Sequence, residues 1–364
     1  MAMTTVETSA GAGGPDGAGA AVEPVERLMG MLNESAVAVL VSIGYQTGLL
    51  EAMAPLPPAT SAQIAEAAGL DERYVREWLG GMTTGLCVDY DAGAGTYQLR
   101  PDYVPLLTGP GVDNLARTLL YITLMGEVAA KIAEKFRTGG GLAYADYPNF
   151  MEIQAGDSAS VHDASLIEVI MPISGCVDRL KTGIDVADVG CGAGHAINLM
   201  AQAFPASRFT GYDFSAEGVA AGRAEAAALG LANAHFEERD VATLDLAGTL
   251  DLVTAFDMVH DQAHPATVLA NIYAALRPGG TFLMVDVNAS SKVEENIDSP
   301  LGPFLYAVST VHCMSVSLGQ GGDGLGTVWG VQLAESMVRA AGFGTVDVTV
   351  LEEDPVNAYF VATK

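Results

Sequence analysis

The side chains best suited to chemistry are two histidines and an aspartate. His260 and Asp261 stand side by side in the run from Phe256 to Pro265, and His312 follows further along the chain. Two imidazoles and a carboxylate can bind Fe(II) or Zn(II) on one face and leave positions open for a chelating ligand. Adjacent side chains converge on one ion only in a bent loop, so this interpretation requires a bend at His260.

A simpler interpretation needs no metal. His260 alone can act as a general base, with Asp261 orienting its ring, and His312 is then a hydrogen-bonded residue of the core. Both interpretations remain open from the sequence. The predicted catalytic residues, which are also the predicted metal ligands, are His260, Asp261 and His312.

A second run, Asp188-Val-Gly-Cys-Gly-Ala-Gly194, is rich in glycine. Glycine lets the backbone turn sharply and approach a ligand closely, so Gly190, Gly192 and Gly194 predict a binding loop between a strand and a helix. One residue separates the last two glycines, whereas the dinucleotide fingerprint has two. Asp213 stands nineteen residues after Gly194, where a carboxylate can accept hydrogen bonds from both hydroxyls of a ribose.

Further residues fit the same nucleoside-binding role. Phe214 follows Asp213 and can face an adenine ring, while Asp240 and Val241 end the next strand. The carboxylate of Asp240 can accept a hydrogen bond from an adenine amino group. The contrary interpretation of these aspartates is that they are solvated acids in loops.

Aromatic side chains gather in two other segments. The first, Gly139 to Phe150, opens with three glycines and is either a mobile lid or a connector packed on the surface. The second is a long insertion, residues 288–330. The predicted substrate contacts from these segments and just beyond them are Tyr144, Tyr147, Phe150, Tyr306, Trp329 and Gln332.

Composition narrows the class of protein. The chain has 364 residues, a net charge of -27 and 50% hydrophobic residues, enough for two domains. Such an acidic surface repels phosphate backbones and anionic lipids, which argues against nucleic acid or a membrane as partner.

Four cysteines without the spacing of a disulfide framework favour a reducing cytoplasm as the location of the protein. Residues 1–24 are predicted to form a disordered tail, because they are rich in glycine and alanine and lack the pattern of a signal peptide. The most apolar stretch, Ala36 to Ile43, is too short to span a bilayer.

Two elements must position these residues. Residues 25–108 predict a winged helix, with helices at 25–50, 61–68 and 71–84 and strands at 87–90 and 96–99. The face of the third helix sets three acids against two bases, whereas a helix in a DNA groove needs a basic face. The unit is therefore predicted to mediate dimerisation. Residues 109–160 are expected to form a helical connector and lid.

Residues 161–364 alternate between strands and helices, which predicts a parallel sheet covered on both faces. Two consecutive strands, 344–351 and 357–363, end the chain without a helix between them. The predicted fold class is thus α/β, a Rossmann-like sheet with a terminal antiparallel hairpin, preceded by an all-α winged-helix domain. The predicted strands of the parallel part are 184–189, 208–212, 234–236, 250–255 and 280–285.

This constellation resembles the class I S-adenosylmethionine (SAM)-dependent methyltransferases, and in particular bacterial small-molecule enzymes of natural-product pathways. The resemblance implies a cytoplasmic homodimer joined through the N-terminal domain, with an insertion that covers the pocket of a small acid substrate. It also implies that SAM is bound by Asp188, Gly190, Gly192, Gly194, Asp213 and Asp240.

Within that class, His260, Asp261 and His312 match a small subgroup that methylates α-keto acids at the β-carbon. The resemblance to this subgroup implies a non-haem metal that binds the keto acid and stabilises its enolate. The alternatives are an O-methyltransferase for a phenol or carboxylate, with His260 as base, and a winged-helix regulator that responds to SAM.

Overall fold

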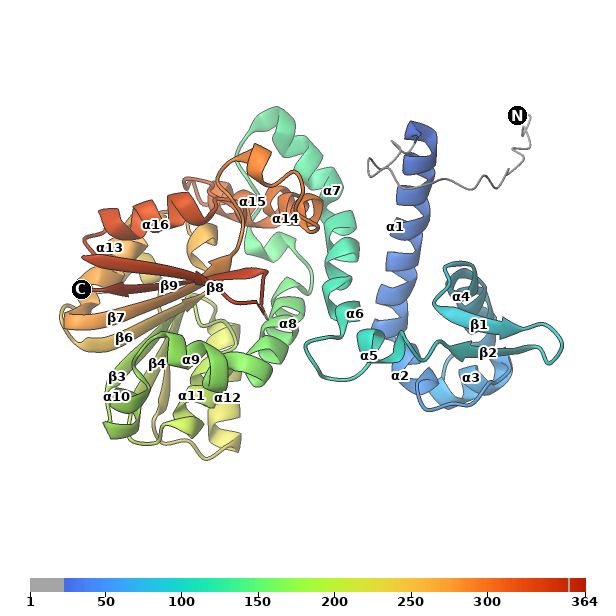
Figure 1. Cartoon of the computed structure of the whole chain (residues 1–364), viewed down its shortest axis with the longest axis horizontal. Coiled ribbons are helices and arrows are strands. Elements are labelled where there is room, and N and C mark those ends of the chain that lie inside the picture. The colour runs from blue at the N-terminus through green and yellow to red at the C-terminus, as the bar shows by residue number, and fades with distance from the viewer. Residues whose placement is uncertain (1–22, 353) are drawn as a thin grey trace, which may run out of the picture.

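The computed structural model describes residues 23–352 and 354–364. Nearly all of the predicted N-terminal tail, residues 1–24, lies outside this range. The described chain forms a small helical unit at the N-terminal end and a larger α/β unit, with a helical connector between them (Figure 1). The predicted fold class is confirmed.

The N-terminal unit is a winged helix whose boundaries follow from local capping. Thr60 caps the second of its predicted helices in a reciprocal pair with Gln63, and Gly69 ends that helix with a φ of 66°, a value that glycine adopts without strain. Asp71 caps the next helix. The unit comprises α1 (Pro24–Gln46), α2 (Leu49–Met53), α3 (Ser61–Ala68), α4 (Glu72–Thr84), β1 (Val88–Asp91) and β2 (Thr96–Leu99).

The basic side chains of α4 are already paired. Arg73 lies 2.5 Å from Glu77, and Arg76 lies 2.6 Å from Glu72. Each arginine is thus neutralised by an acid one turn away on the same helix, which leaves little positive charge for a phosphate backbone.

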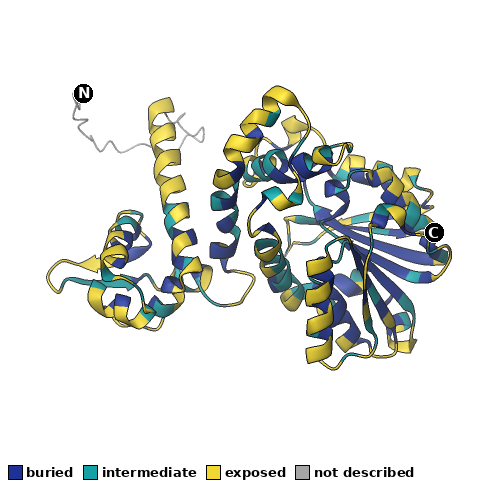
Figure 2. Ribbon diagram, turned by 180° about the vertical axis from the view of Figure 1, so that it is seen from behind, coloured by how far each residue is buried: buried dark blue, intermediate teal, exposed yellow. Residues whose placement is uncertain are grey.

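Helix α1 differs from the sequence-based expectation about membrane spans. The expectation rested on Ala36 to Ile43, but α1 runs for 23 residues. By length and composition alone it is a candidate span, with a mean hydropathy of 1.4 over an 18-residue window. Only 17% of that window is buried in the structure, and α1 is exposed along much of its length (Figure 2).

The connector packs tightly against the insertion. The backbone N–H of Leu142 donates to Ser315 Oγ at 3.0 Å, and the hydroxyl of Tyr147 donates to the Val311 carbonyl at 2.6 Å. A Cβ added to Gly141 would lie only 1.7 Å from the Ser315 carbonyl oxygen, so only glycine fits there. The predicted connector, residues 109–160, contains α6 (Leu115–Thr118), α7 (Leu120–Thr138), η1 (Tyr144–Asp146) and most of α8 (Phe150–Ser165). α5 (Val104–Leu107) precedes it, and the π-helix η2 (Leu166–Ile170) follows it.

The larger unit is a seven-stranded sheet in the order β5-β4-β3-β6-β7-β9-β8. β9 lies between β7 and β8 and runs antiparallel to both, so the terminal hairpin is confirmed. Apolar clusters cover both faces of the sheet. The strands are β3 (Asp185–Val189), β4 (Arg208–Asp213), β5 (Ala234–Glu238), β6 (Leu250–Phe256), β7 (Leu276–Val287), β8 (Thr345–Val350) and β9 (Asn357–Thr363).

Helices and short turns complete the α/β unit. The predicted insertion is largely helical and contacts α7 through the π-helix η6. The remaining elements are α9 (Met171–Ile173), α10 (Val177–Thr182), α11 (His195–Ala203), α12 (Ala216–Ala228), η3 (Val241–Thr243), η4 (Val259–Asp261), α13 (Pro265–Ala275), η5 (Val293–Glu295), α14 (Gly302–Val308), η6 (Ser309–Cys313), α15 (Met314–Gly319) and α16 (Val331–Ala340).

Candidate active site

The glycine-rich run forms a tight loop between β3 and α11. Gly190, Gly192 and Gly194 all have positive φ angles, of 67°, 52° and 75°. The loop is held by the carbonyl of Tyr212, which accepts from the backbone N–H groups of Gly190 at 2.8 Å and Cys191 at 3.1 Å. A Cβ on Gly194 would collide with Phe236 at 2.2 Å. Glycine is therefore required here for both conformation and space.

Two buried aspartates flank this loop. Asp213, at the end of β4, accepts from the backbone N–H groups of Gly192 and Ser215, both at 2.8 Å. Asp188, at the end of β3, accepts from the Thr254 hydroxyl at 2.7 Å. Burial raises the pKa of both carboxyl groups, that of Asp188 to about 7.

A cavity of about 430 Å³ opens beside the loop. Most of the residues predicted to bind the cofactor line it: Asp188, Gly190, Gly192, Gly194, Asp213, Phe214 and Val241. Asp240 does not. Its side chain is exposed and caps η3 by accepting from the Ala242 N–H at 2.8 Å, so any contact with an adenine would have to form at the rim.

His260 lies in η4, a single 3₁₀ turn that supplies the bend required by the metal hypothesis. Its Nδ1 lies 2.9 Å from Asp286 Oδ1, and its Nε2 lies 3.3 Å from Asp261 Oδ1. All three side chains are buried. Burial alone would lower the pKa of His260, but the charges of Asp286 and Asp261 outweigh it and hold the pKa well above its usual value.

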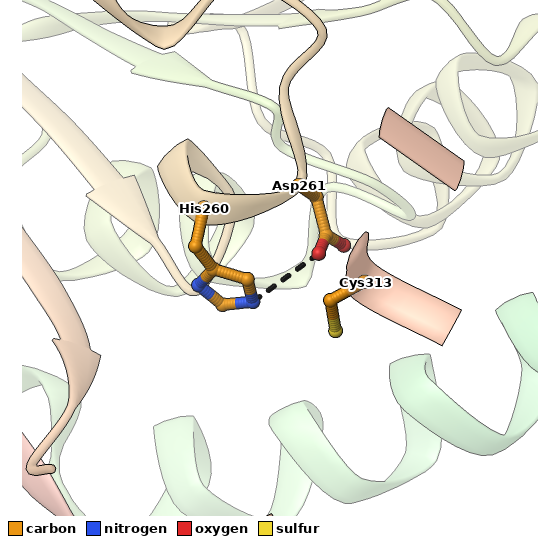
Figure 3. Close-up of side chains that lie close together, drawn as sticks. All are labelled: His260, Asp261 and Cys313. Atoms are coloured by element: carbon orange, nitrogen blue, oxygen red, sulfur yellow. Dashed lines mark ion pairs between the residues drawn. The ribbon is translucent and has the colours of Figure 1, made fainter. Parts of the chain in front are cut away.

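The third member of the potential metal-binding group is Cys313, where the sequence predicted His312. Ligand atoms of His260, Asp261 and Cys313 lie within 4.8 Å of one another (Figure 3). His312 precedes Cys313 in the π-helix η6, and its ring stacks on Phe150 at a centroid separation of 3.5 Å. Burial lowers the pKa of His312 to about 4.

Buried polar atoms without partners collect around this group. Among the described residues, Asp257 Oδ1, Asp261 Oδ1, Asp286 Oδ2 and His312 Nε2 are buried and accept or donate no hydrogen bond. Such atoms are costly unless something pairs with them. Asp257 also has a positive φ of 49°, a backbone conformation that is uncommon outside glycine, although aspartate and asparagine adopt it more often than other residues, and that is found at functional sites.

The residues predicted to contact substrate separate into three environments. Tyr144 lines the cavity beside Phe214, with ring centroids 5.2 Å apart. Tyr147 and Phe150 pack around His312. The other three lie in or near the insertion. Trp329 is buried, and its indole N–H donates to Asp286 Oδ1 at 3.1 Å. Tyr306 accepts a hydrogen bond from Asn296, and Gln332 forms hydrogen bonds with Ser290 and Ser291. Of these six, only Tyr144 borders the cavity.

Sequence reasoning missed three residues of the site. Asp257 and Asp286 each stand at the carboxyl end of a parallel strand, at the edge where ligands bind in this fold, and that position was the available signal. Cys313 had no signal, because a single cysteine in a helix usually packs as a small apolar residue.

Comparison with known proteins agrees with this geometry. Residues 35–109 match the model of an Rv2258c-like winged HTH domain, and residues 180–314 match the model of a methyltransferase domain. Residues 180–314 are a methyltransferase domain. The predicted enzyme class, a SAM-dependent methyltransferase, is confirmed at the level of this domain.

Curated relatives match only part of their own length. A trans-aconitate 2-methyltransferase from Deinococcus radiodurans is 33% identical over 175 residues, which is 46% of this chain and 60% of the relative. The chain spans about three fifths of the curated relatives it matches first.

Solved structures match almost the whole chain and support the fold. Human N-acetylserotonin methyltransferase, solved in complex with SAM, has a TM-score of 0.68 at 16% identity and covers 95% of this chain and 99% of its own. The mitomycin 7-O-methyltransferase has a TM-score of 0.68 at 17% identity, with 93% and 98% covered.

The raised pKa of Asp188 leads to a pH-dependence of SAM binding. Its carboxyl gains charge as the pH rises through about 7, and SAM carries a net positive charge, so the ionised site attracts it more strongly. We expect the Kd for SAM, measured by calorimetry, to fall several-fold between about pH 6 and about pH 8. Asp188→Asn should bind more weakly and show a smaller dependence, because Asp257, which lines the same cavity, also has a pKa of about 7.

Asp245→Asn, an exposed site outside the cavity, should keep the wild-type profile. Equal pH profiles for wild type and Asp188→Asn would contradict the assignment.

Proposed function

We propose that this protein is a cytoplasmic enzyme that transfers the methyl group of SAM to the β-carbon of a small α-keto acid. A divalent metal, Fe(II) or Zn(II), would be held by His260, Asp261 and a side chain of η6. The observation that carries the proposal is the buried His260–Asp261 pair, whose facing atoms lie 3.3 Å apart and are joined by no hydrogen bond.

The donor set suits such a metal. Asp286 Oδ1 accepts from Nδ1 of His260, so in the neutral ring Nε2 carries the lone pair and faces Asp261. A carboxylate behind a ligating imidazole fixes the tautomer and the ring orientation in many metal sites. Imidazole, carboxylate and thiolate ligands together fit Zn(II) or Fe(II).

Charge balance favours the same conclusion. Asp257, Asp261 and Asp286 lie close together, and His260 is the one basic side chain that forms an ion pair with any of them among the described residues. Buried carboxylates without counter-charge are strongly disfavoured. A divalent cation would supply the missing charge and would polarise an oxygen of the acceptor as a Lewis acid.

The charges of the cavity lining favour a cation beside an acid substrate. Among the described residues that line it, none is lysine or arginine, whereas Asp188, Asp213, Asp257 and Asp261 all are part of it. These carboxylates repel an anionic acceptor, and a bound cation would offset that repulsion.

Asp257 is placed to receive the proton that carbon methylation releases. It lines the cavity, and burial together with the Asp286 charge raises its pKa to about 7, near the ideal for a general base. The carboxylate of Asp257 takes the β-hydrogen as a proton, and the C–H electron pair stays on the acceptor. That carbon attacks the methyl group, the C–S bond breaks, and its electron pair passes to sulfur.

The role of Asp257 can be tested by substitution. Asp257→Asn keeps the shape but cannot accept the proton, so we expect kcat to fall about 10²- to 10⁴-fold with the Kd for SAM within about two-fold of wild type. Asp251→Asn, at the opposite end of the same strand, is the matched control for β6. An unchanged kcat in Asp257→Asn would remove it from the reaction.

The metal can be tested without turnover. With metal but no SAM, the wild-type protein should exchange the β-hydrogens of an α-keto acid for deuterium, as followed by NMR, and a chelator should stop the exchange. His260→Ala and Asp261→Ala should lose the metal, measured by elemental analysis. Comparison of His312→Ala with Cys313→Ala identifies the third ligand. Full metal content in His260→Ala would contradict the site.

A second candidate is an O-methyltransferase that acts on a phenol or a carboxylate. The His260–Asp286 hydrogen bond favours it, because a carboxylate that orients an imidazole is also the arrangement of a general base. The orienting residue is then Asp286, where the sequence suggested Asp261. The mitomycin 7-O-methyltransferase supports this candidate only through its fold. Methylation that is insensitive to chelators would favour it. The regulator interpretation gains no support, since the charges of α4 are paired.

The exposed face of α1 supports a homodimer. Val25, Met29, Leu32, Val39 and Ile43 are all exposed and follow an alternating spacing of four and three residues, with Ala36 completing the series. This is the heptad seam of a coiled coil. The opposite face is occupied, because Leu40 and its neighbours pack on α4.

A charge on the seam should separate the subunits. Leu32→Glu is expected to convert a dimer to a monomer in sedimentation experiments, because it buries a carboxylate between two apolar helices. Met31→Glu places the same charge on an exposed position off the seam and should leave the dimer intact. A wild-type chain that sediments as a monomer would refute the dimer directly.

A further inference from the structure

Helix α8 forms one wall of the cavity and presents two rows of side chains to it. Residues four apart lie one above another on a helix. Met151, Ala155 and Ala159 make an apolar row, and Gln154, Ser158 and His162 make a polar row beside it, which we call the α8 polar row. The mechanism proposed above uses none of these side chains.

The α8 polar row has unused hydrogen-bonding capacity. Within the described part of the chain, the side chains of Gln154, Ser158 and His162 make no hydrogen bond. Serines in helices commonly bond back to a carbonyl of the preceding turn, and Ser160 does so with Asp157 and Ser165 with Val161. Ser158 differs from both, although all three share one helix. Its hydroxyl is available to a molecule in the cavity.

His162 is a neutral donor in this row. Its ring packs edge-on against Phe256, with centroids 4.9 Å apart, and burial lowers its pKa to about 4. A neutral imidazole still carries one N–H. The row therefore offers an amide, a hydroxyl and an imidazole, all uncharged, in a cavity whose described lining contains no lysine or arginine.

We propose that the α8 polar row binds a carboxylate. Both molecules in the proposed reaction carry one: the methionine part of SAM and the small acid that accepts the methyl group. Neighbouring members of the row are four residues, about 6 Å, apart along the helix axis. Ser158 and His162 can therefore donate to the two oxygens of a single carboxylate, with Gln154 reaching one of them from the next turn. The inference rests on methyl transfer in this cavity, but it requires neither the metal nor a keto acid.

Two variants separate binding from folding. Ser158→Ala removes one hydroxyl, and His162→Phe removes the N–H but keeps a ring against Phe256. Ser160→Ala, on the same helix but bonded to its own backbone, is the matched control. Thermal unfolding verifies that all three variants fold.

Two probes separate the sources of the carboxylate. Calorimetry first compares SAM with decarboxylated SAM. If the row holds the donor, wild type should prefer SAM by about ten-fold, the loss expected for a hydrogen bond to a charged group, and both variants should lose that preference. If the row holds the acceptor, SAM affinity should be unchanged, and the variants should raise the Kd of α-keto acids, aliphatic and aromatic, by about ten-fold in the presence of S-adenosylhomocysteine.

The proposal would be overturned if both variants bound SAM and the acids as tightly as the wild type does. It would also be overturned if the variants bound SAM as the wild type does and the wild type bound none of the acids. Failure of wild type to bind SAM would instead refute the proposed function, so the two failures are distinguishable.

Discussion

The arrangement of the candidate active site depends on Asp286. One oxygen of this buried carboxylate, at the end of β7, receives the imidazole of His260 at 2.9 Å, the indole N–H of Trp329 at 3.1 Å and the backbone N–H of Val287 at 2.8 Å. These partners belong to η4, to the end of the insertion and to the strand itself. These three buried hydrogen bonds hold the covering segments against the edge of the sheet. Within the part of the chain that the structure describes, the second oxygen of Asp286 has no partner.

The parts of the site that the sequence predicted are those set by local backbone chemistry. Glycine spacing and the strand–turn–helix pattern located the tight loop beside the cavity, and Gly190, Gly192 and Gly194 all have the positive φ that makes glycine necessary. Asp213 could be placed for a similar reason, because the carboxyl end of a parallel strand is defined by the hydrophobic run before it. Caps at Thr60 and Asp71 likewise determine helix ends from a few residues.

The parts that were missed depend on contacts between distant segments. Trp329 was expected to contact substrate, but it does not line the cavity. Its indole N–H donates instead to the buried carboxylate of Asp286, 43 positions earlier in the chain. The triple-glycine loop was open to two interpretations. The packing of Gly141 against the Ser315 carbonyl agrees with a packed connector, and no periodicity in the sequence could reveal a backbone approach across 174 residues. Cys313 takes the place predicted for His312 in the potential metal-binding group because both residues lie in the π-helix η6. No simple sequence pattern predicts a π-helix.

That helix, η6, has a consequence for the choice of ligand atom. A π-helix holds more residues per turn than an α-helix and often results from one extra residue within it. Each residue of an α-helix rotates the chain by about 100° about its axis. Loss of one residue upstream of His312 would therefore turn the following side chains by roughly that angle and change which neighbour, nitrogen or sulfur, is presented to the buried carboxylates. In the proposed metal site, helix register as well as residue type would therefore decide which ligand atom faces the carboxylates.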